Sequence, residues 1–142
     1  MKYIIIILLM FLTSCQNNKY DEYVNYLENQ KENYIDIVDI ELEFIELNEE
    51  TMYKVTIDNP KEKMFDVEAL VIHDYETNDI FPSFGIFEEK YNLYNEKIDD
   101  SYTKGIILIG YIKEFDSNKN FKILIRYKDE NSNNKEFIKY IK

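Results

Sequence analysis

The chain contains one histidine and one cysteine, and these two residues limit the chemistry that it can perform. His73 would have to serve as the base for any serine nucleophile, because the two side chains must lie within hydrogen-bond reach. No serine lies in a glycine-flanked elbow, and His73 falls near the end of an expected strand. A zinc site usually needs three or four nitrogen, sulfur or carboxylate ligands. We therefore expect His73 to be structural, and we expect no catalytic set, metal site or cofactor.

Two loops begin like the ligand positions of a calcium-binding loop. Residues 116–120 and 129–133 both follow the pattern D-x-N-x-N. A calcium-binding loop has a glycine at the bend and a bidentate glutamate at its end. The first loop has Phe121 and Tyr127 at these two positions, and the second has Asn134 and Tyr140. Aspartate and asparagine also favour turns, because they tolerate left-handed backbone and bond their own chain. We expect turn chemistry, with weak calcium binding as the alternative.

Acidic residues form three adjacent pairs, at 49–50, 88–89 and 99–100. Glycosidase chemistry needs two carboxylates on opposite walls of a cleft, roughly 5–10 Å apart. Neighbouring residues of a strand point to opposite faces, so we expect these pairs to be solvated surface. Glycine occurs only at 85, 105 and 110, which excludes a phosphate-cradling glycine loop. An enzyme built on scattered carboxylates remains a further alternative.

Residues 81–104 are rich in aromatic side chains and have little periodicity. Long irregular segments in compact domains tend to be binding loops, and tyrosine suits contact surfaces. An alternative is that these aromatic side chains fold back over an edge of the domain. The candidate binding residues are Phe84, Tyr91, Tyr94 and Tyr102.

The first fifteen residues have the pattern of an export signal. Lys2 supplies a positive charge, and residues 4–12 form an apolar run of nine. A bilayer-spanning helix needs about 20 residues, so this run is not a permanent transmembrane segment. An apolar residue, two small residues and a cysteine close the run as Leu12-Thr13-Ser14-Cys15.

These four residues resemble the lipobox of bacterial lipoproteins, in which a diacylglyceryl group is attached to the cysteine and a peptidase cuts just before it. The resemblance implies that residues 1–14 are a signal peptide and that Cys15 carries lipid. It also implies a location at the extracytoplasmic face of the cell membrane, with the membrane as a partner. We expect residues 15–20 to be a lipidated tether. Since Cys15 is the only cysteine, the mature domain can have no internal disulfide.

Cleavage before Cys15 would leave 128 of the 142 residues, a normal size for one domain. Removal of Lys2 would change the net charge from −11 to −12. A surface this acidic repels phosphates, so we expect no nucleic-acid partner. Cationic partners are compatible with it, although many exported domains are acidic simply to stay soluble.

The periodicity of the mature chain predicts a helix followed by strands, in one domain over 21–142. A helix is expected over 21–33, because Tyr20, Tyr23, Val24 and Leu27 have i, i+3, i+4 and i+7 spacing. Apolar residues change phase at 35–37 and 45–47, which predicts a bulge or a strand that changes sheet. The run 69–72 suits a strand covered on both faces, or one near the middle of a sandwich. Strands are expected over 38–44, 53–57, 64–75, 80–87 (a broken edge strand), 106–112, 121–127 and 137–141.

About seven short strands with regular turn signals predict an all-β protein, an antiparallel sandwich. The middle of the chain is similar to bacterial immunoglobulin-like domains: a strand ends in Asn-Pro (55–60), a charged turn follows (61–63), and a second strand ends in an acidic turn (65–79). This resemblance implies the fold and no activity. We expect a non-enzymatic, lipid-anchored binding module whose partner is an unidentified protein or peptide. The alternative is a protective lipoprotein that captures cationic peptides.

Overall fold

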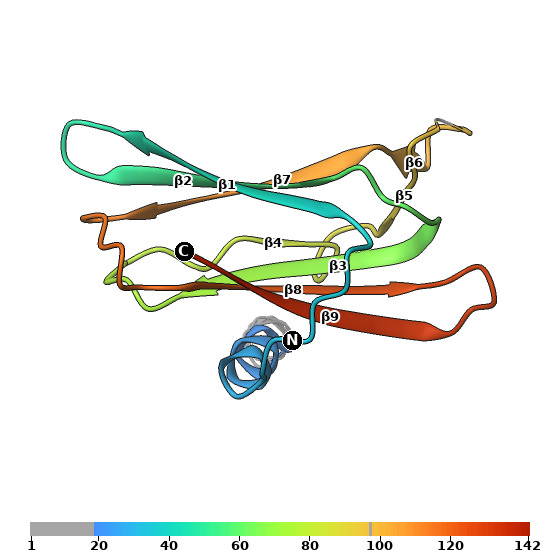
Figure 1. Cartoon of the computed structure of the whole chain (residues 1–142), viewed down its shortest axis with the longest axis horizontal. Helices are drawn as coiled ribbons and strands as arrows, with labels where there is room; N and C mark the ends of the chain where they lie inside the picture. The colour runs from blue at the N-terminus through green and yellow to red at the C-terminus, as the bar shows by residue number, and fades with distance from the viewer. Residues whose placement is uncertain (1–18, 97) are drawn as a thin grey trace, which may run out of the picture.

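The computed structural model describes residues 19–96 and 98–142, which form two stacked β-sheets with one helix against the outer face of the larger sheet (Figure 1). The predicted signal peptide and Cys15 lie outside the described residues. The smaller sheet contains β1 (Asp39–Glu46), β2 (Thr51–Asp58) and β7 (Gly105–Ile112). The larger sheet contains β3 (Met64–His73), β4 (Ser83–Phe84), β5 (Tyr91–Leu93), β6 (Tyr102–Thr103), β8 (Phe121–Lys128) and β9 (Asn134–Ile141). The all-β sandwich is confirmed.

The strand order is β1-β2-β7 in one sheet and β6-β5-β3-β8-β9 in the other, with β4 paired to β3. When the six long strands are lettered A, B, C, E, F and G in chain order, the sheets contain A-B-E and C-F-G. This is the immunoglobulin-like arrangement, without a long strand in the place of D among the described residues. About seven strands were expected and nine are described, because the segment 81–104 contributes three of two or three residues. The pair β5–β6 is parallel, unlike the antiparallel arrangement that was expected throughout.

The main core lies between the two sheets, and strict alternation along the strands builds it. On β2, Tyr53, Val55 and Ile57 are buried while their neighbours are half-buried. Phe121 of β8 packs against Tyr53 with ring centroids 4.8 Å apart. Gly110 of β7 lies against the phenol ring of Tyr53, where any side chain would overlap that ring.

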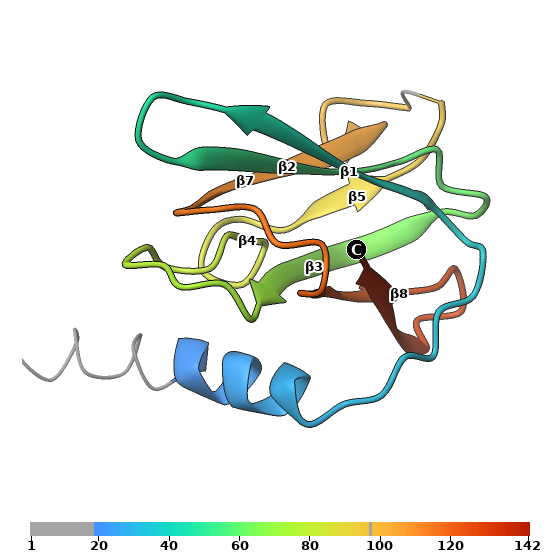
Figure 2. The same ribbon diagram turned by 60° about the vertical axis from the view of Figure 1, so that its left-hand side comes forward.

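A second core lies on the other side of the larger sheet, under the helix (Figure 2). Val67, Ala69 and Val71 of β3 point into the main core, whereas Leu70 and Ile72 point to the helix side. The buried residues that form this second core are Leu27, Leu70, Ile72, Ile86, Leu124 and Ile138. The expectation that 69–72 is covered on both faces is therefore confirmed, and the helix is what covers the outer face.

The described helix covers 19–28 rather than 21–33. Residues beyond it leave the helix because they pair with the edge of β9: the Asn33 amide donates to the Ile138 carbonyl at 3.1 Å, and the Tyr140 amide donates to Glu32 Oε1 at 2.9 Å. At the other end, Lys19 and Tyr20 are already helical, so they do not belong to the predicted tether. Within the part of the chain that the structure describes, no helix has the length and apolar character needed to cross a membrane.

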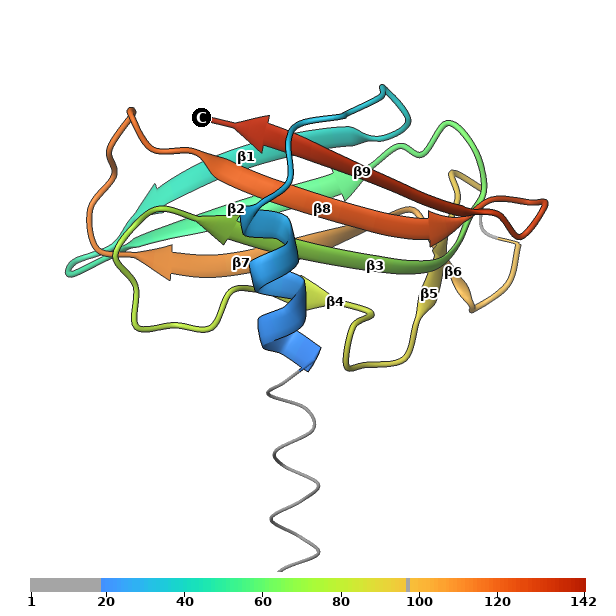
Figure 3. The same ribbon diagram turned by 90° about the horizontal axis from the view of Figure 1, so that it is seen from below.

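The phase changes in the sequence come from neither of the two expected causes, a bulge or a strand that changes sheet. Ile35 and Ile37 lie in a link that carries the chain past β9 to β1 in the other sheet (Figure 3). Ile45 is simply exposed on the outer face of β1. The irregular register lies instead in β3, between Phe65 and Glu68, where Asp66 has a φ of 52°.

Candidate functional site

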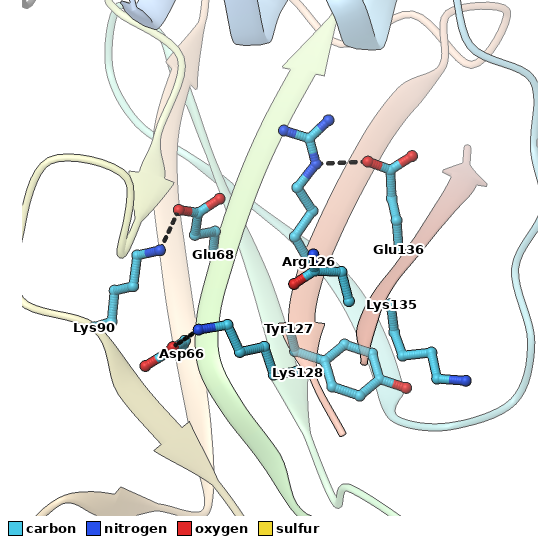
Figure 4. A pocket seen from close by; sticks show the side chains of 9 residues that line it. Asp66, Glu68, Lys90, Arg126, Tyr127, Lys128, Lys135 and Glu136 are labelled. Carbon is cyan, nitrogen blue, oxygen red and sulfur yellow. Dashed lines mark hydrogen bonds and ion pairs between the residues drawn. The ribbon is translucent and has the colours of Figure 1, made fainter. Parts of the chain in front are cut away.

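A shallow hollow of about 260 Å³ lies on the larger sheet beside the helix and is lined almost entirely by ionisable side chains (Figure 4). Glu68 of β3 lies opposite Arg126 of β8, and Arg126 lies opposite Glu136 of β9. Each charge has a partner: Lys90 Nζ is 2.7 Å from Glu68, and Arg126 Nε is 2.5 Å from Glu136. The strand register therefore builds a row of alternating charge across three strands.

The helix contributes two tyrosines to this row. The Tyr23 hydroxyl donates to Glu68 Oε2 at 2.5 Å, and the Tyr26 hydroxyl donates to Glu136 Oε1. The guanidinium of Arg126 extends toward the helix, with its carbon 4.8 Å from the Tyr23 ring centroid and 4.5 Å from the Tyr26 centroid. Arg126 suits this position because its planar cation can contact aromatic faces while it bonds a carboxylate.

The protonation states of the row follow from these contacts. Burial raises the pKa of Glu68, but hydrogen bonds from Lys90 and Tyr23 outweigh it, and the net pKa is lowered. Burial and the hydrogen bond to Glu68 raise the pKa of Tyr23. Glu68 is therefore a carboxylate and Tyr23 a neutral phenol at neutral pH. Both pKa values are shifted away from neutral pH, whereas general acid–base catalysis is most efficient when the pKa lies near the working pH.

Of the four predicted binding residues, the structure brings Phe84 and Tyr91 into contact, whereas the rings of Tyr94 and Tyr102 contact other residues. Phe84 is half-buried and packs against Tyr91 with ring centroids 5.7 Å apart, while Tyr91 is 39% exposed. Tyr102 packs on Phe65 of β3, and Tyr94 lies under Lys63. Phe84 packs against the main core. This agrees, for part of the segment, with the alternative that its aromatic side chains fold back over an edge of the domain.

His73 is 8% exposed and lies among aromatic rings at the end of β3. Its ring centroid is 5.2 Å from those of Tyr53 and Phe121 and 5.0 Å from that of Phe81, all edge-to-face. Nδ1 accepts the Tyr75 amide at 3.2 Å, and Nε2 is buried with no hydrogen-bond partner among the described residues. This is the strand-end packing position that the sequence suggested.

In the two candidate calcium loops, each leading aspartate caps its own turn. Asp116 Oδ1 accepts the amide of Asn118 at 2.9 Å, and Asp129 Oδ1 accepts the amides of Asn131 and Asn133, both at 2.9 Å. Across residues 19–96 and 98–142, no group of three or more histidine, cysteine, aspartate or glutamate side chains is placed to hold a metal. All six residues of the three acidic pairs are exposed.

The outer face of the smaller sheet carries a surface that the sequence analysis missed. Strand β7 exposes 57% of Ile107 and 47% of Ile109. Across the sheet, Ile107 lines up with Thr56 and Glu41, and Ile109 with Lys54 and Glu43. An apolar row on β7 and an acidic row on β1 therefore share this face, on either side of Lys54 and Thr56 of β2. The sequence feature that could have revealed this surface is the run 106–109. It is apolar at every position, although only one face of β7 is covered.

Comparison with protein-family models, with curated proteins and with solved structures finds no match to this chain. The function is therefore inferred from the chain's own residues.

Proposed function

We propose that the chain is a non-enzymatic interaction module, held by lipid on Cys15 at the extracytoplasmic face of the cell membrane. The observation that carries this proposal is the motif Leu12-Thr13-Ser14-Cys15 at the end of a nine-residue apolar run. The described domain supports it in two ways. The ionisable side chains of the hollow neutralise one another, and the one histidine is enclosed by aromatic rings.

Metabolic labelling tests the anchor. Cells that express the chain are fed an alkyne fatty acid, and the protein is analysed for label and by mass spectrometry of its N-terminus. We expect labelled protein that begins at Cys15, no label on a Cys15→Ser variant, and normal label on Thr13→Ser, which keeps a small residue before the cysteine. Unlabelled protein that still carries residues 1–14 would contradict the proposal.

A second function is favoured by the outer face of the smaller sheet: capture of cationic peptides near the membrane. Glu41 and Glu43 of β1 can pair with basic side chains, for which a peptide would displace Lys54 from its ion pair with Glu43, while Ile107 and Ile109 of β7 can cover alternate apolar ones. A mature net charge of −12 also raises the local concentration of cationic peptides. An extended peptide with alternating basic and apolar residues fits this face when it lies along β2, because its alternate side chains then point to opposite sides, toward β1 and toward β7.

A pair of matched charge variants tests this second function. The probe is a short peptide of alternating lysine and valine, titrated against the protein in detergent micelles. We expect Glu41→Gln/Glu43→Gln to weaken binding roughly tenfold, about 1.4 kcal/mol. The control Glu88→Gln/Glu89→Gln removes the same two charges elsewhere and should change binding less than about twofold. Equal weakening by both double variants would show general attraction to an acidic protein and no recognition by this face.

A further inference from the structure

The described helix begins within a few residues of the proposed lipid anchor. Lys19 is helical, and only residues 16–18 separate it from Cys15. Fully extended chain spans at most about 3.6 Å per residue, so the Cα atoms of Cys15 and Lys19 are no more than about 14 Å apart. A tether of this length keeps the start of the helix within reach of the headgroup region. The side of the domain that surrounds Lys19 must therefore be the side nearest to the membrane.

That side of the domain is built by the segment 79–88, which packs on the first described turn of the helix. Lys19 Nζ donates to the carbonyl of Ile86 at 2.8 Å, and the Tyr20 hydroxyl donates to the carbonyl of Phe81 at 3.0 Å. The rings of Tyr20 and Phe87 lie 5.9 Å apart. Figure 3 shows this end of the helix beside β4, at the edge of the sandwich away from β9. The segment and the anchor point therefore share one edge.

This edge exposes side chains that suit a lipid surface. Ile80 is 78% exposed, the largest exposure among the large apolar residues of the described chain, and Phe87 is 37% exposed. Tyr20 and Lys19 combine an apolar body with a polar tip, which is typical of residues at membrane interfaces. Asp79, Glu88 and Glu89 flank the apolar residues and limit insertion to headgroup depth. They also predict a preference for zwitterionic over anionic lipid, because anionic headgroups would repel them.

We infer that Ile80 and Phe87, supported by Lys19 and Tyr20, form a second membrane contact that lays this edge of the sandwich on the bilayer surface. The inference rests on the proposed lipid anchor at Cys15. It fixes the orientation of the domain: the sheets stand on the edge that contains β4, and the opposite edge, with β9, points away from the membrane (Figure 3).

Single tryptophan reporters test this orientation, because the chain contains no tryptophan. The full lipoprotein is reconstituted into phosphatidylcholine vesicles with or without brominated phosphatidylcholine, which quenches tryptophan inside the bilayer. The variants are Ile80→Trp and Phe87→Trp, and the control is Ile109→Trp, which lies on the outer face of the smaller sheet and is similarly exposed. We expect brominated lipid to quench both loop reporters about twofold or more and to leave the control unchanged, because interfacial contacts bury side chains about 5–10 Å deep.

The outcomes separate this inference from the proposed anchor. Protein that floats with the vesicles and shows equal quenching at all three positions, or none, overturns the membrane contact and leaves the anchor in place. Loop emission that shifts to the blue as protein density rises, without quenching by brominated lipid, would identify a second copy of the chain as the occupant and would also overturn it. Protein that carries no lipid and does not float would overturn the anchor itself, and the membrane contact with it.

Discussion

The guanidinium carbon of Arg126 lies 4.5 Å from the ring centroid of Tyr26, and both side chains bond the same carboxylate, that of Glu136. Arg126 belongs to β8, whereas Tyr26 belongs to the helix that follows the proposed anchor. One carboxylate on β9 thus joins the helix to β8 of the larger sheet. The contact of Leu27 with Leu70 and Leu124 buries apolar surface between helix and sheet. The polar contact through Glu136 fixes the helix in one position.

We expect Arg126→Lys to destabilise the domain by about 1–2 kcal/mol, although it keeps the charge. A lysine ammonium cannot contact two rings and bond Glu136 at the same time, because its charge is concentrated at one atom. Urea unfolding followed by circular dichroism measures the loss. Amide hydrogen exchange should be faster in helix 19–28 and unchanged in β2.

A matched control comes from the same hollow. Lys128 pairs with Asp66 at 2.7 Å, but both side chains are nearly half exposed. Exposed ion pairs contribute about 0–1 kcal/mol, so Lys128→Met should change the unfolding free energy by less than about 0.5 kcal/mol. If Arg126→Lys were equally mild, the contact with the two tyrosines would contribute nothing beyond an ordinary surface ion pair.

The stability of the domain should fall as the pH falls through the range in which His73 titrates. Burial lowers the pKa of His73 below its ordinary value of 6.5. The folded state then binds fewer protons than the unfolded state, so its stability is fully present above pH 6.5 and is lost as the pH falls through the folded pKa. Each unit of difference between the two pKa values corresponds to about 1.4 kcal/mol.

His73→Phe tests this assignment, because phenylalanine fits among the rings of Tyr53, Phe81 and Phe121 and does not titrate. The wild type should lose stability between pH 7.5 and 5 in urea titrations, and the variant should lose much less. The carboxylates with lowered pKa values, such as Glu68, act in a lower window, below their ordinary value of 4.5. An equal loss in the variant over the upper window would assign the effect to another group.

Gly110 and Tyr53 should show strong coupling. A Cβ at position 110 would overlap the Tyr53 ring, which is 1% exposed and held by Phe121. We expect Gly110→Ala to cost about 1–3 kcal/mol, as overpacking of a rigid core does. Tyr53→Leu removes the ring, so the double variant should be at least about 1 kcal/mol more stable than the sum of the single effects. Additive effects would mean that the ring can move aside.

The long strands were predictable because their residues alternate regardless of what they pack against. Val55 and Ile57 are apolar in the phase that the main core requires, and the run 69–72 indicated a strand covered on both faces. The helix end was not predictable, because Glu32 and Asn33 are compatible with helix locally. Their pairing with β9 involves residues more than a hundred positions away.

The charged row was hidden for a related reason. Glu68, Arg126 and Glu136 each look like an ordinary residue of a strand's solvent face, and only the register of three strands places them side by side. Tyr26 falls outside the apolar pattern of the helix, so nothing in that pattern pointed to its contact with Arg126. The aromatic segment 81–104 was visible as a composition, but its division between core and surface depends on the short pairings of β4 and β5 with β3.

The backbone conformation of Asp66, and not its charge, should decide which substitutions are tolerated at this position. Its φ of 52° lies in the left-handed region, at the register shift of β3. Asparagine tolerates this region, so Asp66→Asn should stay within about 0.5 kcal/mol of the wild type although it loses the ion pair with Lys128. A β-branched residue is strongly disfavoured there, and Asp66→Val should cost about 1–2 kcal/mol or more in urea unfolding. If the ion pair were the main contribution, Asp66→Asn, Asp66→Val and Lys128→Met would all cost the same. If Asp66→Val alone clearly lowered the free energy of unfolding, the effect would instead be assigned to the backbone at the register shift.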